Sequence, residues 1–202
     1  MHVIGIIELL FAILKRWIIK VPSMKIEGFA LAGVPAAEAG QVDRLLSALA
    51  TQLAARGIRL AGAVQSEVER HDRTRCDMTL RILNSDSNYS ISADLGPLSQ
   101  GCRLDSEALA NAAWEVESLL RAAPDDDLPQ LLIVNKFSKS EAQGKGFAAV
   151  IALAMERGVP VLCGIGQLSS ADFQSFTGAQ AELLEANEQA IEKWVQAQVA
   201  TV

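Results

Sequence analysis

The sequence is short of positive charge. It has 18 Lys and Arg residues against 24 Asp and Glu residues, which gives a formal net charge of −6. Binding to DNA or RNA duplexes depends on cationic side chains that neutralise phosphates, and no Lys/Arg-rich run offsets the acidic balance. The composition therefore argues against a nucleic-acid partner.

Metal-ligating side chains are also scarce. The chain has two histidines and three cysteines, and Cys76, Cys102 and Cys163 are widely spaced and form no CxxC pair. Because a tetrahedral zinc site needs grouped ligands, this pattern argues against one. Dispersed cysteines in odd number indicate reduced thiols and predict a cytoplasmic protein. Cys163 lies within an apolar run and is predicted to be a core residue.

Residues 1–23 differ from the rest of the chain. Charged side chains interrupt their apolar run, which argues against a membrane-spanning helix. On a helical projection these charges share one face, so the stretch predicts an amphipathic helix. Three roles remain open: a dispensable extension if translation starts at Met24, a helix packed on the domain or on a partner chain in an oligomer, or a membrane-surface anchor through residues 3–20. The interrupting charges are Glu8, Lys15, Arg16 and Lys20.

After Met24 the hydrophobic pattern alternates between strands and helices. Continuous apolar runs predict buried parallel strands, and stripes with a period of 3.6 predict helices. A turn-rich stretch between alternating flanks predicts a β-hairpin over 76–92. Asp105 or Ser106 is predicted to cap a helix, and Trp114 and Trp194 are predicted to pack into the core. The predicted strands cover 26–33, 58–65, 130–137 and 159–165, and the predicted helices cover 41–56, 105–121, 141–157 and 179–198.

These strand–helix–strand units predict an α/β fold. We expect three layers with a mostly parallel sheet between helices, an antiparallel β-hairpin insertion and the N-terminal amphipathic helix. The predicted organisation is an extension over 1–23, one α/β domain over 24–178, and a C-terminal helix over 179–202 that packs on the domain. Ligands of open parallel sheets bind beyond the carboxyl ends of the strands, so candidate sites lie in the loops that follow them.

The loop after the first strand has the outline of a phosphate-binding loop but lacks its functional residues. The motif GxxxxGK[ST] supplies a lysine for the phosphates and a hydroxyl for magnesium. Here Gly33 and Gly40 are seven positions apart, Gln41 stands at the lysine position and Val42 at the hydroxyl position. The amides of the helix that follows Gly40 still offer an anion site. The alternative is an ordinary strand-to-helix turn.

The loop after strand 130–137 is cationic. In nucleotide hydrolases such a strand ends in a carboxylate that organises magnesium. This strand instead ends in Asn135 and Lys136, and Lys139 and Lys145 follow in an otherwise acidic protein. The pattern favours an oxyanion site at this strand end, with a solvated loop as the alternative.

Five stretches, taken in order, carry a resemblance to a known family: "ARGIRLAGAVQ", "RCDMTLRIL", "GPLSQGCRLDSEALA", "LLIVNKFSKSEAQGKGF" and "RGVPVLCGI". Over residues 25–178 the chain resembles an uncharacterised bacterial domain family. Genes of that family often neighbour molybdate-transport genes, and some members carry the label of molybdenum-transporter ATP-binding proteins. More distantly, the chain is similar to small P-loop nucleoside triphosphatases, which implies a P-loop-NTPase-like fold. Of their Walker-B motif "DEIGKME", only Lys139 and Glu141 are matched here.

The resemblance implies a role in molybdenum or tungsten metabolism. Two family motifs, "CDM" and "GCRLD", fall on 76–78 and 101–105. Arg103 in the second motif could contact a tetrahedral oxyanion, and the thiolates of Cys76 and Cys102 are candidate ligands for soft metal species. The alternatives are buried structural cysteines and an ion pair between Arg103 and a nearby aspartate.

Together these observations predict a cytoplasmic, non-hydrolysing accessory binding protein with a degenerate nucleotide site. Its partner would be a small anionic ligand, either a nucleotide or a tetrahedral oxyanion such as molybdate or tungstate. One alternative is a nucleoside triphosphatase that uses non-standard residues such as Glu141. Another is a protein-interaction or membrane-associated module. The predicted ligand-binding residues are Gly40, Gln41, Gln65, Arg103, Asn135, Lys136 and Lys139, and the predicted metal ligands are Cys76 and Cys102.

Overall fold

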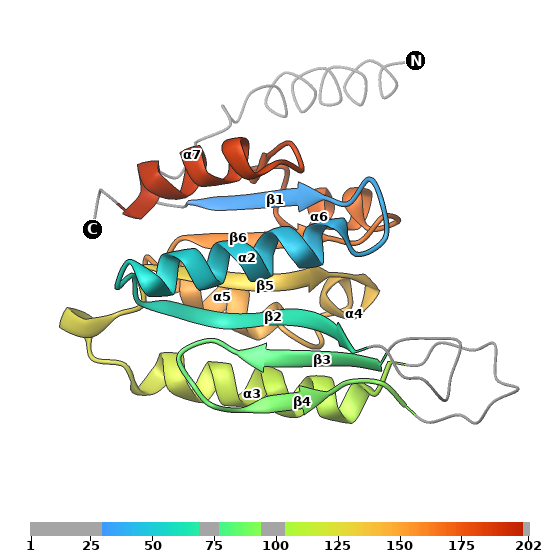
Figure 1. Ribbon diagram of the computed structural model, residues 1–202, viewed down its shortest axis with the longest axis horizontal. Coiled ribbons are helices and arrows are strands. Elements are labelled where there is room, and N and C mark those ends of the chain that lie inside the picture. Colours follow the sequence, from blue (N-terminus) through green and yellow to red (C-terminus); the bar gives the residue numbers. More distant parts are fainter. Residues whose placement is uncertain (1–29, 69–76, 94–103, 200–202) are drawn as a thin grey trace, which may run out of the picture.

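The computed structural model describes residues 30–68, 77–93 and 104–199, and its strands form one sheet in the order β4-β3-β2-β5-β6-β1-β7 (Figure 1). From β2 to β7 every neighbouring pair in this order is parallel, whereas β3 and β4 form an antiparallel hairpin at one edge. The predicted mostly parallel sheet with a hairpin insertion is therefore confirmed. The strands are β1 (Leu31–Pro35), β2 (Leu60–Val68), β3 (Asp77–Ile82), β4 (Asn88–Ser90), β5 (Leu131–Phe137), β6 (Val161–Ile165) and β7 (Glu182–Leu183).

Helices cover both faces of the sheet and bury an apolar core on each. Side chains alternate between the faces along a strand. On β5, Leu131 and Ile133 pack on the side of α2 and α7, and Leu132 and Val134 pack on the side of α3 and α5. The helices are α2 (Gln41–Ala55), α3 (Ser106–Ala122), α4 (Lys139–Ala142), α5 (Ala148–Glu156), α6 (Ser170–Phe176) and α7 (Glu188–Val199), with a short 3-10 turn at Asp125–Asp127.

Side-chain hydrogen bonds fix the start of α3 and hold the β3–β4 hairpin against this helix. The Asp105 carboxylate accepts hydrogen bonds from the first amides of α3, as the sequence predicts. The Tyr89 hydroxyl of the hairpin donates to the Glu115 carboxylate of α3 over 2.6 Å, and the Ser85 hydroxyl donates to the same carboxylate over 2.8 Å. These bonds lower the pKa of Glu115 and hold the hairpin on α3.

The predicted helix over 141–157 is wrong in its first third. The chain instead ends α4 at Ala142, turns, and begins α5 at Ala148. After α4 the backbone turns through Gly144 and Gly146, which have φ angles of 74° and 53°. These left-handed conformations suit glycine and interrupt a helix. The Glu141 side chain folds into the turn and accepts a hydrogen bond from the Phe147 amide over 3.3 Å.

The predicted helix over 179–198 begins only at Glu188. The preceding residues add β7 to the edge of the sheet, where the Leu184 amide donates to the Gly33 carbonyl over 2.9 Å. The Asn187 side chain then caps α7 by accepting from the Ala190 amide. The apolar residues before this cap fit a helical period as well as they fit a strand, so the hydrophobic pattern alone did not reveal β7. The helix does pack on the domain, through Ile191, Trp194 and Val195.

The predictions for three individual core residues have different outcomes. Trp194 and Cys163 are buried as predicted, and burial raises the pKa of the Cys163 thiol. Trp114 is 70% exposed, because it lies on the solvent side of α3, away from the buried residues of that helix. Residues 1–29, and with them the predicted amphipathic helix, lie outside the described residues. Within the described part of the chain, no helix is long and apolar enough to cross a membrane.

Candidate functional site

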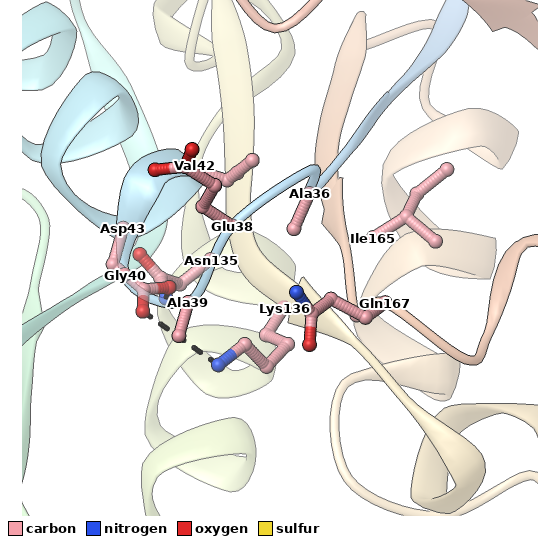
Figure 2. Close-up of a pocket in the computed structure, with 11 residues that line it drawn as sticks. Ala36, Glu38, Ala39, Gly40, Val42, Asp43, Asn135, Lys136, Ile165 and Gln167 are labelled. Atoms are coloured by element: carbon pink, nitrogen blue, oxygen red, sulfur yellow. Dashed lines mark hydrogen bonds and ion pairs between the residues drawn. The ribbon is translucent and has the colours of Figure 1, made fainter.

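A cavity of about 210 Å³ lies at the carboxyl ends of β1, β5 and β6, beside the N-terminus of α2 (Figure 2). Parallel sheets bind ligands at this edge. The lining residues are Ala36, Glu38, Ala39 and Gly40 from the β1–α2 loop, Val42 and Asp43 from the first turn of α2, Asn135 and Lys136 from β5, and Ile165, Gly166 and Gln167 from the end of β6 and its loop.

The N-terminus of α2 is open toward this cavity. Its N-cap residue, Gly40, has a φ of 71°, a left-handed conformation that glycine adopts without strain, and it supplies no side-chain acceptor for the helix amides. Because this end of α2, a helix of 15 residues, lies beside the cavity, the positive end of the helix dipole is directed at it. The Gln167 side chain donates to the Ala37 carbonyl over 3.1 Å, and this bond joins the two loops that flank the cavity.

A bulge in β5 aims two polar side chains at α2. The pairing of β5 with β6 is regular up to Val134 opposite Cys163 and resumes at Phe137 opposite Ile165, so β5 has one residue more than β6 in this interval. An extra residue kinks a strand and redirects its side chains. In a regular strand Asn135 and Lys136 would point to opposite faces, but here both reach Asp43 of α2 (Figure 2).

The resulting network joins three elements. The Asn135 amide group donates to Asp43 Oδ1 over 2.7 Å, and Asn135 Oδ1 accepts from the Gln65 backbone amide over 2.8 Å. Lys136 Nζ lies 3.6 Å from Asp43 Oδ2, and its side chain is 44% exposed. Asn135 thus bridges β2 to α2. The Lys136–Asp43 separation exceeds normal hydrogen-bond length, so the ammonium group keeps donors for a ligand.

A glycine in β6 allows α2 to approach this closely. A β-carbon on Gly164 would lie 2.2 Å from the Asn135 carbonyl oxygen and 2.7 Å from Val42 Cγ1. Either contact is far shorter than side chains tolerate, so a larger residue would force α2 and β5 away from β6. The contact between Asp43 and Asn135 therefore depends on the missing side chain at Gly164.

The structure brings some of the predicted site residues together. Gly40, Asn135 and Lys136 line one cavity, although they come from distant parts of the sequence. Gln41 does not join them. Its side chain turns away from the cavity and donates to the Ala186 carbonyl over 3.1 Å, between α2 and the segment before α7.

The other predicted residues lie elsewhere. Gln65 supports Asn135 with its backbone amide, and its side chain lies on the wall of a neighbouring cavity. Lys139 is exposed on α4 and does not line the first cavity. Arg103, Cys76 and Cys102 lie outside the described residues.

Asp43 was missed by the sequence prediction. It lies on the buried stripe of α2 with Leu46, Ala50 and Leu53, and it is only 5% exposed. A carboxylate on the apolar face of a helix is costly to bury without partners, so its position in the pattern was a usable signal. A search confined to the lysine and hydroxyl positions of a phosphate loop overlooks it.

Glu141 has a structural role in the neighbouring loop. It is 1% exposed, and its Oε2 accepts from the amide and the hydroxyl of Ser138, over 2.9 Å and 2.7 Å. Its Oε1 accepts from the Phe147 amide. These bonds form a capping box that starts α4. Among the described residues, no group of three or more His, Cys, Asp or Glu side chains is placed to hold a metal ion.

Comparison with known proteins places the chain in a family. Residues 31–194 match the family model described as "Protein of unknown function (DUF2478)". Over 155 residues the chain is 34% identical to "Molybdenum import ATP-binding protein ModC 2" of Bradyrhizobium diazoefficiens; the match covers 76% of this chain but only 16% of that relative.

A solved structure, the "Solution Structure of a Human Cancer-Related Nucleoside Triphosphatase", has the same fold. The TM-score is 0.55 at 15% sequence identity, and the match covers 85% of this chain and 96% of that one. At this identity the likeness concerns the fold alone. Because the family model spans most of the chain, the protein belongs to the DUF2478 family, with an α/β fold similar to that of P-loop nucleoside triphosphatases.

Proposed function

We propose that the protein binds a small oxyanion, or the phosphate group of a larger ligand, in the cavity beside α2 and does not hydrolyse it. The observation that carries this proposal is that the open N-terminus of α2 and the Lys136 ammonium border the same cavity. Drug-sized ligands occupy roughly 300–1,000 Å³. At about 210 Å³ the cavity suits an anionic group better than a whole nucleotide.

The charged groups that line the cavity are of both signs. The α2 N-terminus and Lys136 favour an anion, whereas the buried Asp43 and the exposed Glu38 oppose one. Asn135 holds Asp43 with a hydrogen bond, so the carboxylate stays on the cavity wall with its charge facing Lys136. This balance supports reversible binding of moderate affinity, and it favours an oxyanion that retains a proton for Asp43 to accept.

The residues that differ from a working phosphate loop support binding without hydrolysis. Gln41 replaces the lysine and points away from the cavity, and Val42 replaces the hydroxyl that would hold magnesium. Asn135 stands where a Walker-B carboxylate would organise the metal. Glu141, the remaining candidate carboxylate, holds the β5–α4 loop together instead.

The relative from Bradyrhizobium supports a role in molybdenum metabolism, and molybdate and tungstate are therefore the first oxyanions to test. This chain spans only 16% of that relative, so the import activity in its name is not transferred with the match. We propose an accessory binding role rather than transport.

Titration calorimetry on the full chain tests the proposal with molybdate, tungstate, sulfate, inorganic phosphate and ATP. We expect at least one of these to bind with a Kd below about 1 mM, and Lys136→Met to weaken that binding by about tenfold or more. Lys145→Met is the matched control, because it removes the same charge from an exposed position in the β5–α5 connection.

Absence of binding for every ligand, or equal losses in Lys136→Met and Lys145→Met, would overturn the proposed site. Phosphate release from ATP or GTP with magnesium tests the non-hydrolysing part separately. We expect the background rate. Turnover that disappears in Asp43→Asn would show that the cavity is catalytic instead.

A further inference from the structure

A second cavity of about 230 Å³ lies on the other side of β5, between the sheet and α3. Its wall is mainly apolar and includes Met78 and Leu80 of β3, Leu109 of α3, Val134 of β5 and Phe147 before α5. Its polar lining consists of Asn135, Lys136, Ser138 and Glu141, from the carboxyl end of β5 to α4, and of Gln65 from β2. An apolar chamber with a few convergent polar groups is the usual form of a small-molecule site.

The two cavities share residues. Asn135 and Lys136 line both of them, because the bulge in β5 places this pair at the junction between the α2 face and the α3 face of the sheet. Each cavity is smaller than the roughly 300 Å³ at the lower end for drug-sized ligands, whereas the two taken together exceed it. The geometry thus suits one ligand that extends past Lys136 from one chamber into the other.

We propose that the two cavities form one site for a phosphorylated small molecule, which places its phosphate beside α2 and a single apolar ring in the second cavity. This inference rests on the proposed function of the first cavity. It names the ligand class: an organic monophosphate rather than a free inorganic oxyanion. Lys136 lies at the junction, where its ammonium group contacts the phosphate and its methylene stem covers the ring.

The polar groups of the second cavity indicate which substituent the ring carries. Glu141 lines this cavity, and among the described residues its Oε1 accepts only the 3.3 Å bond from the Phe147 amide. A carboxylate oxygen accepts two hydrogen bonds, so Oε1 retains capacity for a donor. The Ser138 hydroxyl, in contrast, is engaged by Glu141 Oε2. The ring is therefore expected to carry an N–H or O–H group on the edge that faces Glu141.

Calorimetry of the full chain with inorganic phosphate and with phenyl phosphate tests this inference. Transfer of a ring-sized apolar group from water is worth a gain of about tenfold to a hundredfold in affinity, so phenyl phosphate should bind tighter than phosphate by that factor. Leu109→Trp, which fills the second cavity, should remove this advantage and leave the affinity for inorganic phosphate unchanged. Leu119→Trp is the matched control, because Leu119 lies on the same helix and is 45% exposed.

Met78→Trp fills the same cavity from the opposite wall and replaces Leu109→Trp if that variant does not fold. Equal affinity for the two ligands, or an effect of the filling variants no larger than that of Leu119→Trp, would overturn the inference and leave the proposed function standing. Failure of both ligands to bind would also overturn the inference, and the proposed function would fall with it only if molybdate, tungstate, sulfate and ATP failed to bind as well.

Discussion

The loops after β1 and after β5 leave the same edge of the sheet, yet they use their polar groups differently. In the β5–α5 connection, Ser138 and Glu141 hydrogen-bond to each other and to backbone amides of the connection, so most of their hydrogen-bonding capacity is used there. In the β1–α2 loop, Gly40 provides no side-chain acceptor, and the first turn of α2 borders a cavity. The connection richer in charge thus uses most of its polar groups on itself, whereas the loop with few polar side chains leaves a helix end open to a ligand.

The largest expected effect is the loss of stability when the Glu141 side chain is removed, and it tests this comparison most strongly. Glu141→Ala leaves the Ser138 and Phe147 amides without an acceptor in a buried turn, so we expect the free energy of unfolding to fall by about 2–4 kcal/mol. Urea denaturation measures the loss. Glu38→Ala, at an exposed position in the other loop, should change stability by less than about 0.5 kcal/mol. Similar losses in the two variants would contradict the comparison.

Substitutions at two glycines test the comparison between the two loops more finely. Gly40 and Gly144 have φ angles of 71° and 74°, so alanine at either position should cost about 1 kcal/mol of stability. Only Gly40→Ala should also weaken oxyanion binding, because only Gly40 lies at the helix end that borders the cavity. Thermal denaturation and calorimetry on the two variants separate these effects. A loss of affinity in Gly144→Ala would show that the second loop also binds the ligand.

The smallest expected effect concerns Asp43. Asp43→Asn keeps an acceptor for Asn135 and removes one of the two carboxylate charges that oppose an anion. We expect molybdate and sulfate, which carry no proton near neutral pH, to bind a few-fold tighter, and phosphate to change less, since it retains a proton that Asp43 can accept. Calorimetry at constant ionic strength measures both. Weaker binding of all three anions would mean that Asp43 contributes directly to ligand binding.

The fold was largely predictable from hydrophobic periodicity. Strands such as 130–137 are continuous apolar runs, and the helix after Gly40 has a clear stripe, so these elements were found nearly to their ends. The errors occurred where tertiary contacts outweighed the pattern. A buried carboxylate and two glycines divide the predicted helix over 141–157, and edge pairing with β1 converts the start of the predicted helix over 179–198 into a strand.

The candidate site was only partly predictable. Asn135 and Lys136 could be placed at a strand end, and the rule for parallel sheets brings that end near the loop after β1. The bulge that turns both side chains toward α2 leaves no mark in a single sequence, since it is an offset of pairing between two strands. The direction of Gln41 likewise depends on Ala186, which is remote in sequence.

The position in β6 at Gly164 has no reactive group, yet it sets the height of α2 above the sheet. Alanine there would lift the helix, separate Asp43 from Asn135 and open the cavity floor, while every polar residue of the chain stayed in place. Binding would then be lost in a variant whose chemistry is intact. In this protein the tolerance of the site to mutation thus depends on a backbone spacing as well as on its charged residues.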